Sequence, residues 1–119
     1  MTSINHSAIT FGVFVPQGWK MELVGIPTAT EKWQAAVDVA VRAERAGFDS
    51  IWVYDHFHNV PRPAHEAVFE CWTVMAAISQ LTTKIRLGQM VGCNLYRPPS
   101  LLAKITSTLD VISGGRLDW

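Results

Sequence analysis

The stretch DSIWVYDHF, residues 49–57, places a short apolar run directly before an acid and an imidazole. The run 51–54 is β-branched and aromatic, which predicts a strand buried on both faces. Asp55 and His56 then lie where that strand leaves the sheet. In parallel α/β proteins, ligands and chemistry gather at the carboxyl ends of strands. We therefore predict a proton-handling pair at this point of the chain.

Further strands are expected on either side of this stretch. The segment ITFGVFV, residues 9–15, is rich in β-forming residues and is stopped by Pro16, so it predicts the first strand. Residues 50–54 form the second strand and residues 85–91 the third. Residues 116–119 read as the start of a fourth. The loops between strands and helices are long after the first and second strands, as functional loops often are.

Helices are expected between these strands, over residues 28–46, 69–81 and 98–113. Thr28 and Glu31 have the spacing of a capping box, and Gly47 is a favourable stop. Pro98-Pro99 suits a first turn, where a missing N–H costs nothing. Apolar residues recur at helical spacing in each segment. The predicted buried positions are Trp33, Ala36, Val37, Ala40 and Val41; Cys71, Val74, Met75, Ile78 and Leu81; and Leu101, Leu102, Ile105, Leu109 and Ile112.

Strict alternation of strand and helix predicts an α/β fold with a parallel sheet and right-handed crossovers. The strand ends must then share one edge, which brings together Gln17, Asp55, His56, Cys93 and Asn94. The sequence stops in the middle of an element, after Trp119. We therefore expect residues 1–119 to be the N-terminal part of a longer domain.

The composition argues against a nucleic-acid-binding, a membrane-spanning and a disulfide-rich secreted protein. Ten acidic and ten basic side chains balance among 119 residues, so no basic surface for nucleic acid is expected. The longest apolar run, residues 74–78, is too short to span a membrane, and residues 1–10 do not resemble a secretory signal. Two cysteines do not make a disulfide framework. We expect a cytoplasmic protein that acts on a small molecule and binds neither nucleic acid nor membrane.

The residues at the strand ends leave alternatives open. Asp55 has the residue type of a turn cap, and His56 that of a structural histidine held by Asp55. The spacing His56-x-His58, with His65 nearby, also suggests a metal-dependent hydrolase, although further ligands are not evident and we assign no metal ligand. Cys93 has no surrounding residues that predict a nucleophile.

Several motifs resemble those of the luciferase-like monooxygenase superfamily. They are YDHF at residues 54–57, LG at 87–88 leading into GCNLYRP at 92–98, LAK at 102–104, and LDVISGGRL at 109–117. The resemblance runs from about Ile9 to Trp119, and its nearest branch is the deazaflavin-dependent oxidoreductases that use coenzyme F-420 (F420). It implies a (β/α)8 TIM barrel, of which residues 1–119 are the N-terminal, incomplete portion.

The resemblance also implies a site and a reaction. Asp55 and His56 map onto the family's active-site pair, with His56 as the acid or base and Asp55 orienting it or polarising the cofactor ring. Met90, Val91, Gly92, Cys93 and Asn94 map onto the loop that lines the cofactor, and a non-proline cis peptide is implied at Met90–Val91. The implied activity is hydride transfer between F420 and an organic substrate. Sugar-phosphate dehydrogenases of this branch carry a tryptophan where this chain has Val60.

Three alternatives to F420-dependent hydride transfer stay open from the sequence. One is a flavin (FMN)-dependent monooxygenase of the same superfamily. Another is the metal-dependent hydrolase. The third is a non-catalytic fragment that associates with itself. A partial barrel leaves strand edges and apolar faces uncovered, so we expect a homo-oligomer and no turnover from the 119 residues alone.

Overall fold

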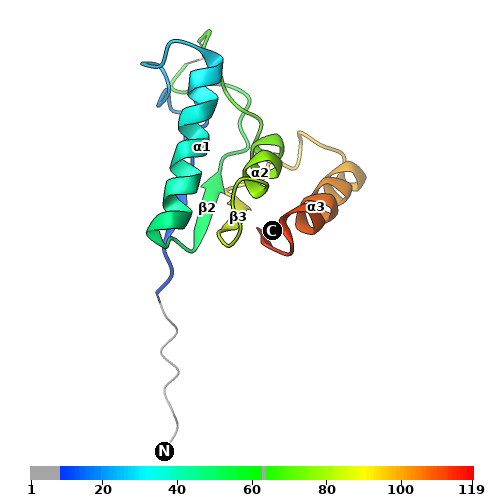
Figure 1. Cartoon of the computed structure of the whole chain (residues 1–119). Coiled ribbons are helices and arrows are strands. Elements are labelled where there is room, and N and C mark those ends of the chain that lie inside the picture. The colour runs from blue at the N-terminus through cyan, green and yellow to red at the C-terminus, as the bar shows by residue number, and fades with distance from the viewer. Residues whose placement is uncertain (1–8, 63) are drawn as a thin grey trace, which may run out of the picture.

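The structure is a computed structural model that describes residues 9–62 and 64–119. Strands and helices alternate along the chain, as the sequence predicts (Figure 1). The elements are β1 (Gly12–Phe14), α1 (Ala29–Ala46), β2 (Ser50–Val53), α2 (Cys71–Ser79), β3 (Arg86–Gln89), α3 (Pro99–Ser113) and β4 (Leu117–Asp118). The strands are shorter than expected: the segment predicted over residues 9–15 pairs as a strand only over Gly12–Phe14.

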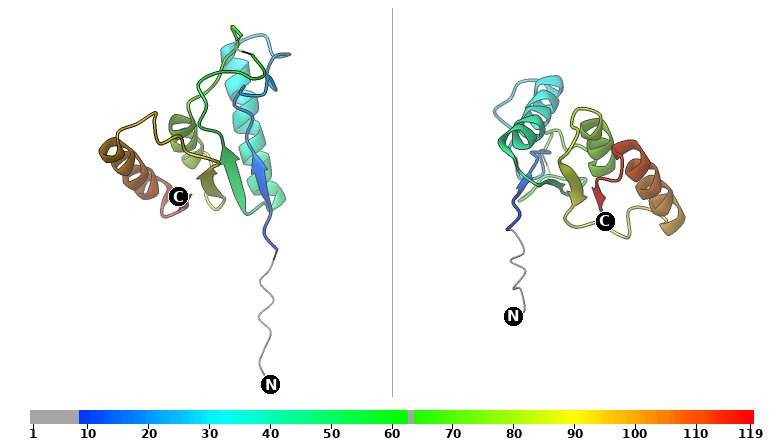
Figure 2. Two further views of the ribbon diagram at one scale, coloured as in Figure 1. Left: turned by 180° about the vertical axis from the view of Figure 1, so that it is seen from behind. Right: turned by 60° about the horizontal axis from the view of Figure 1, so that its bottom comes forward.

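The four strands form one sheet in the order β1-β2-β3-β4, and every pair is parallel. In this register Ile51 of β2 lies opposite Val13 of β1 and Leu87 of β3. The three helices lie on one face of the sheet and follow one another around it (Figure 2). All four carboxyl ends therefore share one edge, which we call the carboxyl edge.

The helix boundaries follow from local signals. The Thr28 side chain accepts from the backbone of Glu31, whose carboxylate accepts from Thr28 in return, so the predicted capping box begins α1. Gly47 ends α1 in the left-handed region at φ 84°, and Gly114 ends α3 at φ 70°. These positions require glycine because a Cβ disfavours positive φ.

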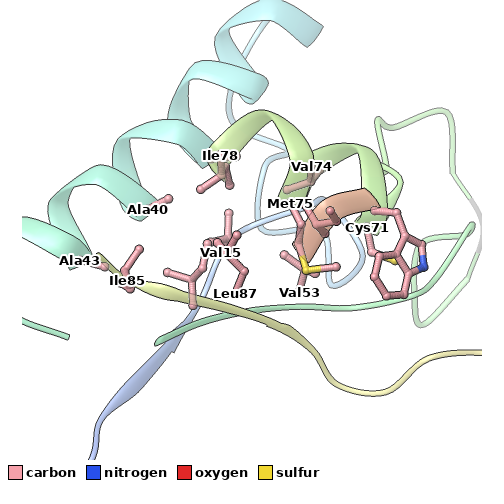
Figure 3. Packing of buried hydrophobic residues seen from close by; sticks show 14 residues of the cluster. Val15, Ala40, Ala43, Val53, Cys71, Val74, Met75, Ile78, Ile85 and Leu87 are labelled. Atoms are coloured by element: carbon pink, nitrogen blue, oxygen red, sulfur yellow. The ribbon is translucent and has the colours of Figure 1, made fainter. Parts of the chain in front are cut away.

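A single apolar core joins the sheet to α1 and α2 (Figure 3). Its centre is Ile51, Met75, Ile78 and Leu87, none of which has exposed surface. Most of the predicted stripes are confirmed, but three positions are wrong. Leu81 is 52% exposed, Leu101 50% and Ile112 44%, because the described chain places no element against those flanks of α2 and α3.

The face of the sheet opposite the helices is only partly covered, contrary to the expectation that β2 is buried on both faces. Ile51 and Val53 are fully buried toward the helices, whereas Trp52 and Tyr54 are half-buried. The Trp52 ring lies across the neighbouring strands, where a Cβ on Gly12 or on Gly88 would come within 2.5 Å of it. Both strands therefore need glycine beside Trp52.

Glu44, in the last turns of α1, binds the segment that leads into β3. Its Oε1 accepts from the backbone N–H groups of Thr83, Lys84 and Ile85 at 2.8, 2.6 and 3.0 Å. Burial acts to raise the pKa of this carboxyl, but the three amides outweigh it and lower the pKa. Glu44 thus joins the end of α1 to the chain that enters β3.

Across residues 9–62 and 64–119, no helix is long and apolar enough to cross a bilayer.

Candidate functional site

Asp55 lies two residues after the end of β2 and has only 2% of its surface exposed. Its carboxylate receives both arms of the Arg97 guanidinium, at 2.7 Å from Nη1 to Oδ2 and 2.9 Å from Nη2 to Oδ1. The backbone N–H of Cys93 donates to Oδ2 at 2.9 Å. These bonds join the end of β2 to the segment that follows β3.

Two further groups, the half-buried Glu70 and the buried Cys71, complete this cluster. Glu70 accepts from the backbone N–H groups of Trp72 and Thr73, at 3.2 and 2.7 Å, and so caps the start of α2. The same carboxylate accepts from Arg97 Nη2 at 2.5 Å. The Cys71 thiol lies 3.3 Å from Asp55 Oδ1 and is 1% exposed. Arg97 therefore stands between two carboxylates at the junction of β2, α2 and the segment after β3.

The electrostatics of the cluster favour a charged Asp55 and a neutral Cys71. Burial acts to raise the pKa of Asp55, but the Arg97 hydrogen bonds and the Cys93 amide outweigh it and lower the pKa. For Cys71, burial is the main cause that raises the thiol pKa far above its usual range, and the Asp55 charge adds to it. Cys71 therefore stays a protonated thiol at neutral pH, which argues against a nucleophilic role.

The metal-hydrolase alternative finds little support here. Asp55, Glu70 and Cys71 place ligand atoms within 4.8 Å of one another, a spacing that a cation could bridge. Arg97 donates to both carboxylates and supplies the positive charge at that point. The histidines that suggested a metal site are not part of the cluster, and both His58 and His65 are exposed.

Acid should destabilise the protein through this cluster. The folded-state pKa values of Asp55 and Glu70 are lowered, so their contribution is complete above the unfolded values near 4 and is lost as pH falls through the folded values. We expect the free energy of unfolding to fall below about pH 4. Urea unfolding at several pH values checks this, with Asp55→Asn as the comparison. In Asp55→Asn the free energy of unfolding should fall less steeply with falling pH than in the unchanged protein. An equally steep fall would show that the pKa of Asp55 is not lowered by folding.

His56 does not pair with Asp55 as the sequence suggested. Both Asp55 oxygens bond elsewhere, and His56 instead stacks on Trp19, with ring centroids 4.1 Å apart and planes 7° from parallel. Trp19 also contacts Tyr54, at 4.4 Å between centroids. Trp19, in the loop after β1, thus orients the imidazole. Asp55 does not, because its carboxylate binds Arg97.

The loop after β1 is docked firmly on the loop after β2, which explains how Trp19 reaches His56. Gln17 is 1% exposed, and its amide donates to the carbonyl oxygens of Tyr54 and Phe69, each at 3.0 Å. Gly18 adopts φ 94° against the carbonyl of Ala67, where a Cβ would come within 1.9 Å. Gln17 therefore reaches the strand end that the sequence predicted, and it holds two loops together there.

The segment expected to line a cofactor follows β3. It contains the cis peptide Met90–Val91 that the family resemblance implied. Val91 and Gly92 line a hollow of about 470 Å³, together with Trp52, Gln89, Asp118 and Trp119. The Cys93 amide is bound to Asp55, while Met90 and Asn94 are exposed. Apolar walls with few polar groups and this volume fit a planar ring system.

Sequence reasoning assigned no role to Arg97, Glu70 or Trp19. Arg97 was visible only as part of the family motif, and Glu70 lay just inside the predicted second helix. A charged residue in an otherwise apolar stretch was the available signal for Arg97, since buried arginines are rare unless paired. Trp19 gave no local signal, because its partner lies 37 residues away in a different loop.

Comparison with known proteins agrees with the fold and identifies the family. Residues 9–119 match the model of the family described as luciferase-like monooxygenase. An F420-dependent glucose-6-phosphate dehydrogenase from Amycolatopsis mediterranei is 33% identical over 99 residues, which are 79% of this chain and 29% of that protein. A pyrimidine monooxygenase RutA from Rhizobium rhizogenes is 27% identical over 110 residues, 88% of this chain and 30% of that protein. The chain thus spans less than a third of these curated relatives.

Solved structures give the same picture. An F420-dependent secondary alcohol dehydrogenase, in complex with an F420-acetone adduct, superposes with a TM-score of 0.72 and 27% identity, over 91% of this chain and 29% of that one. The monooxygenase RslO1 from Streptomyces bottropensis superposes with a TM-score of 0.75 and 24% identity, over 92% of this chain and 32% of that one. At this identity the likeness supports the fold alone. The fold is the N-terminal portion of a (β/α)8 TIM barrel, as expected. With a family match over residues 9–119, the chain belongs to the luciferase-like monooxygenase family.

Proposed function

We propose that the whole protein carrying these residues is an oxidoreductase that transfers a hydride between F420 and a small organic substrate. The observation that carries this proposal is the hollow at the carboxyl edge, whose walls include Val91 and Gly92. Its preference for F420 rests on two relatives, the Amycolatopsis dehydrogenase and the secondary alcohol dehydrogenase, whose names include this cofactor. F420, when bound, would supply the centre that accepts or donates the hydride.

The residues of this chain would bind, orient and handle protons. Val91 and Gly92 would contact the ring, with Met90, Cys93 and Asn94 shaping the rest of the loop. A ring nitrogen of His56 would donate a proton to the substrate oxygen or remove one, depending on the direction of reaction. Trp19 would hold the imidazole plane by stacking, at 4.1 Å between centroids. The exposed side of His56 leaves room for a substrate, since the residue is only half-buried.

An FMN-dependent monooxygenase is the second candidate, and the RutA relative favours it. The two proposals differ in the cofactor, so binding decides between them. The purified whole protein would be titrated with F420 and, separately, with FMN, and followed by absorbance and fluorescence. We expect F420 to bind at least about tenfold more tightly, a difference of about 1.4 kcal/mol. Tighter binding of FMN would replace the first proposal by the second, and binding of neither would remove both.

We also propose that the 119-residue chain by itself associates into homo-oligomers. Within the four-stranded sheet, β1 and β4 each have a strand partner on one side only. Large apolar side chains next to these two strands are exposed, Phe11 before β1 by 62% and Trp119 after β4 by 67%. Unpaired strand edges and exposed apolar surface promote association.

Size-exclusion chromatography with light scattering tests this association. We expect a mass well above the 13.2 kDa of one chain. Phe11→Glu and Trp119→Glu together should lower the measured mass, because a charge beside an outer strand opposes pairing with the strand of another chain. A monomer that unfolds in one sharp transition would contradict the proposal.

A further inference from the structure

We propose that Arg97 is a positioning residue of the carboxyl edge. It fixes the segment 90–97, which we call the 90–97 loop, to the carboxyl end of β2 and to the start of α2. The expected effect of Arg97 on cofactor binding rests on the function proposed above. Its expected effect on the order of the 90–97 loop does not depend on that function. The inference comes from three sets of contacts that converge on this loop.

The first set is the guanidinium of Arg97, which is 8% exposed. Its two arms meet the two oxygens of Asp55 at 2.7 and 2.9 Å, and Nη2 also donates to Glu70. A planar guanidinium fixes direction as well as distance in such a two-point contact, which an ammonium group cannot do. Arg97 therefore ties the end of the 90–97 loop both to Asp55, two residues after β2, and to Glu70, the cap of α2.

The second set concerns the oxygens of Asp55. Oδ1 accepts from Arg97 and lies 3.3 Å from the Cys71 thiol. Oδ2 accepts from Arg97 and from the Cys93 amide. Each oxygen thus has two partners, and the residue is 2% exposed. Asp55 consequently has no accessible acceptor for a cofactor, and it would act on a bound ring only through the loop that it holds.

The third set secures the rest of the loop. The Met90 N–H donates to the carbonyl oxygen of Val53 at 2.8 Å, next to the end of β3. The ring of Tyr96 stacks on Phe57, with centroids 4.0 Å apart and planes 12° from parallel. The loop is therefore held near residues 90, 93, 96 and 97. Val91 and Gly92, which line the hollow, lie between the first two of these points. Release of Arg97 should loosen this wall of the hollow.

The test compares Arg97→Ala and Arg97→Lys with Arg86→Ala in the whole protein. Arg86 is a matched control because it pairs with Asp118 on the neighbouring strand but is exposed. The readouts are amide hydrogen exchange of the 90–97 loop and alkylation of Cys71, the buried thiol of the cluster. For Arg97→Ala we expect both rates to rise at least about tenfold, since local opening sets such rates. Arg86→Ala should leave them unchanged.

Two further results separate positioning from general stability. Guanidinium ion, added to Arg97→Ala below denaturing concentration, should restore slow exchange and slow alkylation, whereas Arg97→Lys should restore them only in part. Exchange in β2 and β3 should stay slow throughout. Unchanged exchange of the loop in Arg97→Ala would overturn the proposal. So would equally fast exchange in both strands, because Arg97 would then support the whole fold rather than the loop.

Cofactor titration completes the experiment. If the unchanged protein binds F420 or FMN, we expect Arg97→Ala to weaken that binding by about tenfold or more and guanidinium to recover it. Undiminished affinity in Arg97→Ala would overturn the link between the loop and the cofactor. If the unchanged protein binds neither cofactor, the proposed function fails, while the exchange and alkylation results still decide whether Arg97 positions the loop.

Discussion

Replacing His56 by alanine is expected to slow turnover of the whole protein by about 10²- to 10⁴-fold, the usual contribution of a positioned proton donor or acceptor. The expectation rests on its place three residues after the end of β2 and on its half-buried ring, which stacks on Trp19. Loss of proton transfer should lower kcat and leave the cofactor Kd nearly unchanged. Steady-state kinetics with an organic substrate that the unchanged whole protein turns over, and a separate cofactor titration, measure the two effects.

His58→Ala is the matched control for this prediction, because His58 lies in the same loop but is exposed. Its kcat should equal that of the unchanged protein. Full activity in His56→Ala would remove His56 from the proton-transfer role. Loss of cofactor binding with unchanged kcat at saturation would assign it to binding instead.

Replacing Asp55 by alanine is expected to lower the free energy of unfolding by about 3–5 kcal/mol, because it leaves the Arg97 charge buried with one of its two carboxylate partners gone. The side chains of Asp55 and Arg97 are 1% and 8% exposed, so water screens their interaction little. Urea unfolding of the whole protein, followed by circular dichroism, measures the change.

Two variants make this second prediction sharp. Asp118→Ala breaks the exposed pair with Arg86 and should cost no more than about 1 kcal/mol. The double variant Asp55→Ala with Arg97→Met should be less destabilised than Asp55→Ala alone, because it also removes the buried guanidinium that has lost its two-point contact with Asp55. If the double variant loses the sum of the two single effects, the two residues are not coupled and the cluster does not act as a unit.

The order of elements could be predicted from the sequence because the signals are local. A capping box at Thr28 and Glu31 and a glycine at position 47 determine where α1 begins and ends, and each acts within one helical turn. Alternation of strand and helix then leaves a parallel sheet as the simplest arrangement. Asp55 could be placed at the carboxyl edge by the same reasoning, since it follows a buried run.

The contacts of that edge depend on the tertiary structure. Arg97 reaches Asp55 across 42 positions of sequence, and Trp19 reaches His56 across 37. Neighbouring residues in a sequence need not share a partner: Asp55 turns toward Arg97 and α2, while His56 turns toward the first loop. The exposure of Leu101 and Ile112 has the same origin, since a helical stripe shows which residues are apolar and not what covers them. The sequence by itself therefore determined the β/α order, the helix ends and the strand end that carries Asp55 and His56. Only the packing of distant loops decided that Arg97 binds Asp55 and that Trp19 orients His56, because side-chain direction depends on neighbours that sequence spacing does not reveal.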